Sequence, residues 1–209
     1  MTKRTTEVPE GLPLPNALKE LQTPPRKMRF FWQGDPGWGH DQLGEGTSSM
    51  GGGGCLVTSL TMLAMYFGTK NTSLTPGQAN IDMRKASAFI EGKSDLVMHR
   101  GAAVLGLEAP AEDRLKSYWG DPALKKLLLD TIALGDAAII HVSTDGDPKD
   151  GGEHFIAAFK IEGDCIVCAD PALGRPVFIP LSTMSLKVMW RDKEKLYQIV
   201  SVAPVRVAA

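Results

Sequence analysis

Cys55 is the residue in this sequence that is best placed for covalent chemistry. It follows the run Gly51–Gly54 and begins the apolar stretch Cys55–Phe67, in which apolar residues recur at three- and four-residue spacing. This pattern predicts a buried helix. The N-terminus of a helix carries free N–H groups and partial positive charge, and both stabilise a thiolate, the nucleophilic form of cysteine. The alternative interpretation is that Cys55 is a small buried apolar residue without chemistry.

A histidine could act as the base for such a thiol, and His154 has the better position. It opens the stretch His154–Phe159 directly after Gly151-Gly152, and a strand end beside a glycine loop can direct an imidazole into a cleft. His141 lies inside the apolar run Ala138–Val142, where we expect a buried, hydrogen-bonded core histidine. The two remaining histidines are interpreted as surface residues: His40 and His99.

Asp170 is a candidate partner for that imidazole. The stretches Glu153–Ile161 and Asp164–Ala169 read as an antiparallel hairpin that turns at Glu162-Gly163. Asp170 follows His154 by 16 residues, so the hairpin brings the two side by side. A carboxylate hydrogen-bonded to an imidazole fixes its tautomer and stabilises the imidazolium. The alternative is that Asp170-Pro171 simply opens a turn.

Four segments, in this order, resemble the papain-like cysteine peptidases related to the bacteriocin-processing peptidases, which cut after double-glycine leaders. The segments are Trp32–Trp38, Gly54–Leu63, Glu153–Ile156 and Cys168–Pro171. The resemblance runs from about residue 31 to residue 180. It implies an α+β, papain-like fold, in which a central N-terminal helix that carries the cysteine packs on an antiparallel sheet that carries the histidine and the aspartate.

The same resemblance implies a role for each site residue. Cys55 is the nucleophile, His154 the base and Asp170 the group that orients the histidine. Gln33, which lies 22 residues before Cys55, is the oxyanion donor. The resemblance implies no cofactor and no metal ion.

These assignments predict a cysteine hydrolase that cleaves a peptide or amide bond. Peptidoglycan peptides are one substrate class within this prediction, with delivery outside the cell by a phage particle or a secretion machine. A second interpretation keeps the triad but performs deamidation or acyl transfer. A third, from another class, is a non-catalytic papain-like module that serves as a structural or binding part of a larger assembly.

The other two cysteines do not suggest a metal or redox site. Cys165 and Cys168 lie three apart in a predicted strand and should point to opposite faces. A structural zinc ion needs four ligands, and the sequence has no second pair of this kind. An odd total of three cysteines favours a reducing compartment over a disulfide framework.

The elements that must position the site come as helices first and strands afterwards, which is an α+β pattern. We expect a Pro-rich N-terminal arm over residues 1–28, which could contact a protein partner, and a single domain over 29–209 with a helical lobe at 74–118. The further helices are predicted at 76 to about 90, 95–105, 110–118 and from Pro122 to Gly135. The further strands are predicted at Ala137–Val142, Val177–Ile179 and Leu196–Val202.

The composition excludes several classes of protein. The chain has 209 residues, of which 43% are hydrophobic and 22% charged, and its net charge is −1. These values exclude disorder over the whole chain. The chain also lacks the excess of basic residues that is typical of a nucleic-acid binder. The start of the chain has no signal-peptide pattern, and no apolar run is long enough to span a membrane. We therefore expect a protein that is cytoplasmic as synthesised.

Overall fold

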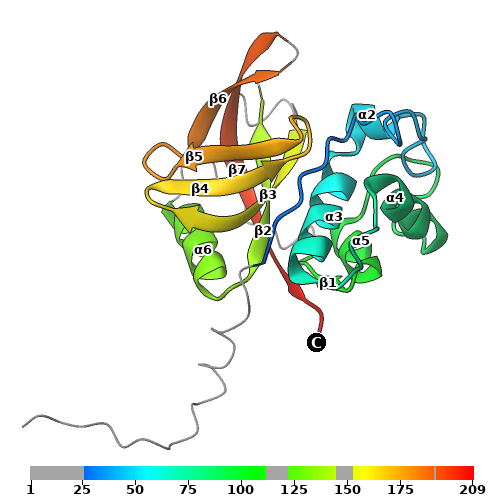
Figure 1. The fold of residues 1–209 in the computed structure, drawn as a ribbon, viewed down its shortest axis with the longest axis horizontal. Helices are drawn as coiled ribbons and strands as arrows, with labels where there is room; N and C mark the ends of the chain where they lie inside the picture. The colour runs from blue at the N-terminus through cyan, green and yellow to red at the C-terminus, as the bar shows by residue number, and fades with distance from the viewer. Residues whose placement is uncertain (1–25, 112–121, 145–152, 191) are drawn as a thin grey trace, which may run out of the picture.

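The computed structural model describes residues 26–111, 122–144, 153–190 and 192–209. It has an α+β architecture in which helices pack on an antiparallel sheet, as the sequence predicts (Figure 1). The early helices form one side of the molecule, and the strands with one later helix form the other. The predicted arm lies largely outside the described residues, but Met28, at its end, is buried in the core.

The central helix α3 spans Cys55–Phe67, the range predicted from the apolar pattern. Every residue from Cys55 to Ala64 is buried, because this helix is surrounded by other elements. It ends at Gly68, which adopts a left-handed conformation with φ of 75°. The glycine run before it forms one helical turn, α2 (Met50–Gly53), which is capped by the side chain of Ser49.

Two further helices complete the helical lobe. Helix α4 (Pro76–Lys85) begins as predicted, with the Thr75 side chain accepting a hydrogen bond from the backbone N–H of Gln78. The prediction that it continues to about residue 90 is wrong, because Ser87 has a φ of 52° and turns the chain out of the helix. Helix α5 (Met98–Val104) is shorter than the predicted 95–105. The predicted helix 110–118 lies almost wholly outside the described residues.

Among the described residues, seven strands form the sheet, and all neighbouring strands are antiparallel. Along the sheet they run in the order β1-β7-β2-β3-β4-β5, and β6 also pairs with β7. Their bounds are β1 Leu107–Glu108, β2 Ala137–Ser143, β3 Glu153–Glu162, β4 Cys165–Asp170, β5 Arg175–Pro180, β6 Ser185–Trp190 and β7 Lys193–Val207. The predicted hairpin is β3–β4. Strands β1 and β6 were not predicted, and β7 is longer than expected.

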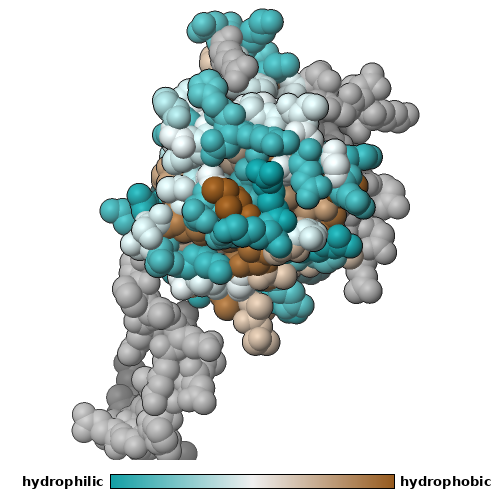
Figure 2. Space-filling view, turned by 90° about the vertical axis from the view of Figure 1, so that its right-hand side faces the viewer, coloured by the Kyte–Doolittle hydropathy of each residue, from teal (hydrophilic) through white to brown (hydrophobic). Residues whose placement is uncertain are grey.

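The two faces of the sheet bury different cores. One face packs against α3. Along a strand, successive residues point to opposite faces, so on β2 Ile139 belongs to the core beneath α3 and Ile140 to the other core. The second face encloses a core that also includes α6 (Pro122–Ala133). The outer surface of the helical lobe is mostly hydrophilic, with a few hydrophobic side chains gathered near its centre (Figure 2). The site described below lies where the helical lobe meets the sheet.

Candidate active site

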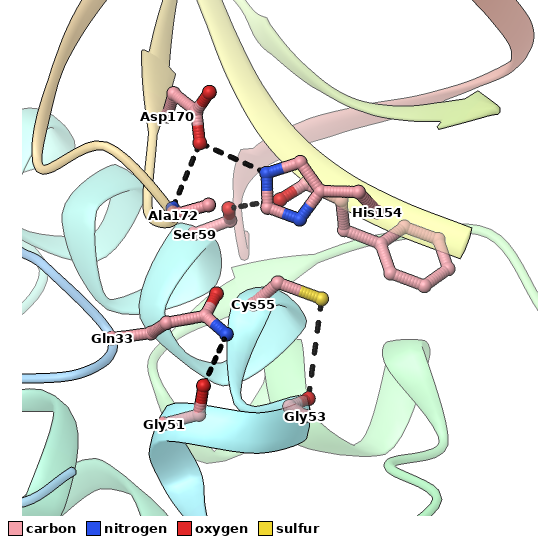
Figure 3. A network of polar contacts seen from close by, with 9 residues as sticks. Gln33, Gly51, Gly53, Cys55, Ser59, His154, Asp170 and Ala172 are labelled. Carbon is pink, nitrogen blue, oxygen red and sulfur yellow. Dashed lines mark hydrogen bonds and ion pairs between the residues drawn. The ribbon is translucent and has the colours of Figure 1, made fainter. Parts of the chain in front are cut away.

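The structure brings together all four residues that the sequence singled out. Cys55 begins α3, His154 is at the start of β3, Asp170 ends β4, and Gln33 lies in the loop before α2 (Figure 3). Cys55, His154 and Gln33 line one cleft of about 710 Å³ between the helical lobe and the sheet. Asp170 lies behind His154 and is fully buried. A thiol, an imidazole and an amide therefore line the same cleft.

A sharp junction between α2 and α3 places Cys55 at a true helix start. The first backbone hydrogen bond of α3 runs from Thr58 N to Gly54 O, at 2.9 Å. Gly54 suits this junction because a Cβ there would lie 2.5 Å from the carbonyl oxygen of Met50. The Cys55 side chain is buried, and its Sγ contacts the carbonyl oxygen of Gly53 at 3.9 Å. The sulfur thus lies at the N-terminus of α3, the end of a helix that carries free amides and partial positive charge.

Ser59 ties the helix of the cysteine to the strand of the histidine. It lies four residues after Cys55, hence on the same side of α3, and its Oγ donates a hydrogen bond of 3.0 Å to the carbonyl oxygen of Phe155. Phe155 is the residue directly after His154. This bond therefore helps to hold Cys55 and His154 in register across two elements.

The His154 ring is held by Asp170. Its Nε2 lies 2.9 Å from Oδ1 of Asp170, and the same oxygen accepts a 2.8 Å bond from the backbone N–H of Ala172. The other ring nitrogen lies on the side of Cys55 (Figure 3). Donating Nε2–H to a carboxylate leaves this second nitrogen to exchange a proton with the thiol. The predicted hairpin pairing thus produces the predicted contact.

The environment favours the imidazolium form of His154. Burial alone lowers the pKa of His154, but the hydrogen bond to Asp170, the hydrogen bond with Cys55 and the charges of both groups outweigh it and raise the pKa from 6.5 to about 9. A positively charged imidazole beside a thiol is the condition for a thiolate–imidazolium pair.

We expect Asp170→Asn to lower the pKa of His154. The amide keeps an oxygen acceptor but removes the negative charge, which is one of the causes that raise this pKa. In the wild-type protein the ring should lose its proton as the pH rises through about 9, and in the variant it should do so at lower pH. An NMR titration of the ring protons measures both, with the exposed His40 as internal control. An unchanged titration of His154 would mean that Asp170 does not stabilise its charge.

Gln33 faces the cleft from the loop Trp32–Gly39. Its backbone N–H donates to the carbonyl oxygen of Pro171 at 2.8 Å, which ties this loop to the turn after Asp170. Its side-chain Nε2 donates to the carbonyl oxygen of Gly51 at 3.2 Å (Figure 3). An amide nitrogen carries two hydrogens, so one is held by Gly51 and the other remains for a second acceptor beside Cys55.

Two aromatic residues at the site were missed from the sequence. Trp190, at the end of β6, stacks on the His154 ring with centroids 6.2 Å apart and an interplanar angle of 21°. Tyr197, on β7, lies at 5.5 Å and 51°. Both come from the hairpin β6–β7, whose first strand lacks a clear alternating pattern. The only available signal was aromatic residues in a region of strand propensity.

His141 differs from its prediction. It is half-buried rather than enclosed in the core, stacks on Phe155 with ring centroids 5.0 Å apart, and lines the same cleft as Cys55. Of the predicted surface histidines, His40 is exposed and His99 is half-buried. The ring of His154 is paired with the buried carboxylate of Asp170, and this contact favours His154 as the base.

The other cysteines lie away from this chemistry. All three are free thiols. Cys168 is fully buried, and burial followed by the charge of Asp170 raises the pKa of its thiol. Cys165 is half-buried at the start of β4. Over the described residues, no group of three or more His, Cys, Asp or Glu side chains is arranged to hold a metal ion, and no helix has the length and apolar character needed to cross a membrane.

Comparison with solved structures gives matches. The chain is similar to the crystal structure of a double glycine motif protease from an AMS/PCAT transporter, solved in complex with the leader peptide. The two share 19% sequence identity, the alignment covers 88% of this chain and 93% of that chain, and the TM-score is 0.44. This is the kind of peptidase that the sequence motifs resemble. No family description and no curated protein matches the chain.

Proposed function

We propose that this chain is a papain-like cysteine hydrolase that cleaves a peptide or amide bond through Cys55, His154 and Asp170. The observation that carries the proposal is one arrangement in a single cleft. A thiol lies at a helix N-terminus, beside an imidazole whose far nitrogen is 2.9 Å from a fully buried carboxylate. This combination of nucleophile, base and orienting group supports acyl transfer.

In the first step, the Cys55 thiolate attacks the carbonyl carbon of the substrate and forms a C–S bond. The carbonyl oxygen becomes an oxyanion, which the Cys55 backbone N–H and the free Nε2–H of Gln33 can stabilise. The imidazolium of His154 then gives its proton to the leaving nitrogen, the C–N bond breaks, and the amine departs. The product is a thioester on Cys55 and a neutral imidazole.

In the second step, the neutral His154 removes a proton from a water molecule, and the resulting hydroxide attacks the thioester. The C–S bond breaks, the carboxylic acid product is released, and the thiolate–imidazolium pair is restored. Asp170 stays ionised and holds the ring orientation throughout. An amine in place of water would give acyl transfer with the same residues, so the incoming group decides between the two reactions.

The cleft walls are compatible with an extended peptide. The helical side is largely apolar, and the sheet side contributes polar groups. The helical side carries Leu43, Leu56, Val57, Ile90, Leu96 and Met98 beside the polar Ser94 and Asp95, and the sheet side carries His141, Thr144 and Ser201 beside the aromatic Phe155 and Trp190. Next to the nucleophile, Gly52 and Gly53 line the cleft without side chains, so a substrate backbone can approach Cys55 closely. Peptides, including those of peptidoglycan, are therefore the substrates that we propose to test first.

The proposal is tested by incubating the protein with three substrate sets and analysing the products by mass spectrometry. The sets are a proteome-derived peptide library, purified peptidoglycan and glutamine-containing peptides. New peptide termini are the expected result, together with a Cys55-linked acyl group trapped by rapid acid quenching. Deamidated glutamine without new termini would favour the deamidase interpretation. The absence of any product or adduct in all three sets would favour the non-catalytic module.

We expect Gln33→Ala to slow turnover without inactivating the thiol. Losing one oxyanion donor typically costs about 10²–10³ in kcat, and Gln33 is placed to act on the oxyanion rather than on the thiol proton. The variant should therefore alkylate at Cys55 with a near-normal dependence on pH. Iodoacetamide labelling between pH 5 and pH 9, beside a kcat measurement, checks both parts. A shifted labelling curve would assign Gln33 to the thiol instead.

A further inference from the structure

Two buried polar atoms behind the His154–Asp170 pair lack hydrogen-bond partners among the residues that the structure describes. They are Oδ2 of Asp170 and the hydroxyl oxygen of Tyr197. Both residues have no exposed surface. An unpaired buried polar group costs free energy, and native proteins pair nearly all of them. These two atoms are complementary, because a carboxylate accepts hydrogen bonds and a phenol donates one.

Tyr197 is close to both members of the pair. Its ring lies 5.5 Å from that of His154, measured between centroids. Burial and, after it, the charge of Asp170 raise the pKa of the Tyr197 hydroxyl, so the carboxylate charge acts on this hydroxyl. Oδ1 of Asp170 is already shared by His154 and Ala172. Oδ2 is thus the carboxylate oxygen left for Tyr197.

We propose that Tyr197 is a positioning residue of the candidate site, whose hydroxyl donates a hydrogen bond to Oδ2 of Asp170. Held at both oxygens, the carboxylate cannot rotate away from His154, and Tyr197 acts through it without touching the substrate. The strand β7 therefore contributes to the site twice, with Ser201 in the cleft wall and with Tyr197 behind the histidine. This inference rests on the proposed function for its effect on turnover, but not for its effect on His154.

The sign of the effect on His154 follows from the charges. The bond from Tyr197 stabilises the Asp170 carboxylate most when His154 is neutral, because the carboxylate then has no cationic partner. Removing the hydroxyl should therefore penalise the neutral form of His154 more than the imidazolium, and the ring should hold its proton to higher pH. A residue that only fills space behind the ring would not produce this change.

The test is Tyr197→Phe, which keeps the ring and removes the hydroxyl. We expect the NMR titration of His154 to move to higher pH. We also expect kcat to fall roughly tenfold with little change in KM, since a tenfold change corresponds to the loss of one charge-assisted hydrogen bond. Tyr66→Phe is the matched control. Its hydroxyl donates to the carbonyl oxygen of Phe159 at 3.4 Å, so its loss should leave the His154 titration unchanged.

An unmoved His154 titration in Tyr197→Phe, with only a lower unfolding temperature, would overturn the proposal. If this variant does not fold, the wild-type hydroxyl proton is observed instead. It should be protected from exchange and should shift in Asp170→Asn, and a proton that does not respond to that substitution also overturns the proposal. A wild-type protein without turnover contradicts the proposed function alone, because the titration needs no substrate.

Discussion

Replacing Cys55 by alanine is expected to abolish turnover while leaving the fold intact. Removing the nucleophile of a comparable catalytic unit costs on the order of 10⁶ in kcat. We expect little loss of stability, since alanine also suits this small buried position and the substitution removes only the weak contact of the sulfur with the carbonyl oxygen of Gly53 and its interaction with His154. Turnover is measured on the best substrate from the library, and unfolding is followed by circular dichroism. Cys55→Ser should behave in the same way, because a serine hydroxyl is far less acidic than a thiol.

Iodoacetamide labelling gives a control that needs no substrate. The wild-type protein should be alkylated first at Cys55, and Cys55→Ala should lose this rapid phase. Cys165→Ala is the matched variant and should retain it. Cys168 should stay unlabelled in all three, because it is fully buried and burial raises the pKa of its thiol. Turnover within about tenfold of the wild-type rate in Cys55→Ala would reject the nucleophile assignment.

Local sequence signals predicted the parts of the site that depend on one element and its neighbour. The apolar run beginning at Cys55 gave the bounds of α3, because a helix buried on all sides needs apolar residues on all sides. The predicted hairpin is present as β3–β4, with its turn at Gly163-Asp164 rather than at the predicted Glu162-Gly163, and it brings His154 close to Asp170. Such features are short-range, so they are visible in the residues themselves.

The features that were not predicted depend on contacts between distant segments. Trp190 and Tyr197 reach His154 because of the order of strands in the sheet. Strand β7 pairs with β2, which in turn pairs with β3, although β7 is the last strand of the chain. The bond from Ser59 to Phe155 joins residues 96 positions apart. The cleft exposure of His141 likewise depends on the helical lobe opposite its strand. The apolar neighbours of His141 in sequence suggested burial, but they point to both faces of the sheet.

His154→Ala is expected to remove turnover as completely as Cys55→Ala does. The thiolate and the imidazolium act as one unit, so the loss of either costs on the order of 10⁶ in kcat. The variant should also lose the rapid alkylation of Cys55 near neutral pH, because the cation that accompanies the thiolate is gone. Both quantities are measured beside those of the wild-type protein, with circular dichroism to verify folding.

The informative comparison is His141→Ala, since His141 lines the same cleft from the neighbouring strand. Its ring stacks on Phe155, whereas the ring of His154 is held by the buried carboxylate of Asp170, so we expect the loss of His141 to affect binding and stability more than chemistry. Rapid labelling of Cys55 should therefore persist in His141→Ala and disappear in His154→Ala. The reverse result would make His141 the base, and the contact between His154 and Asp170 would then be a structural pair within the second core of the sheet.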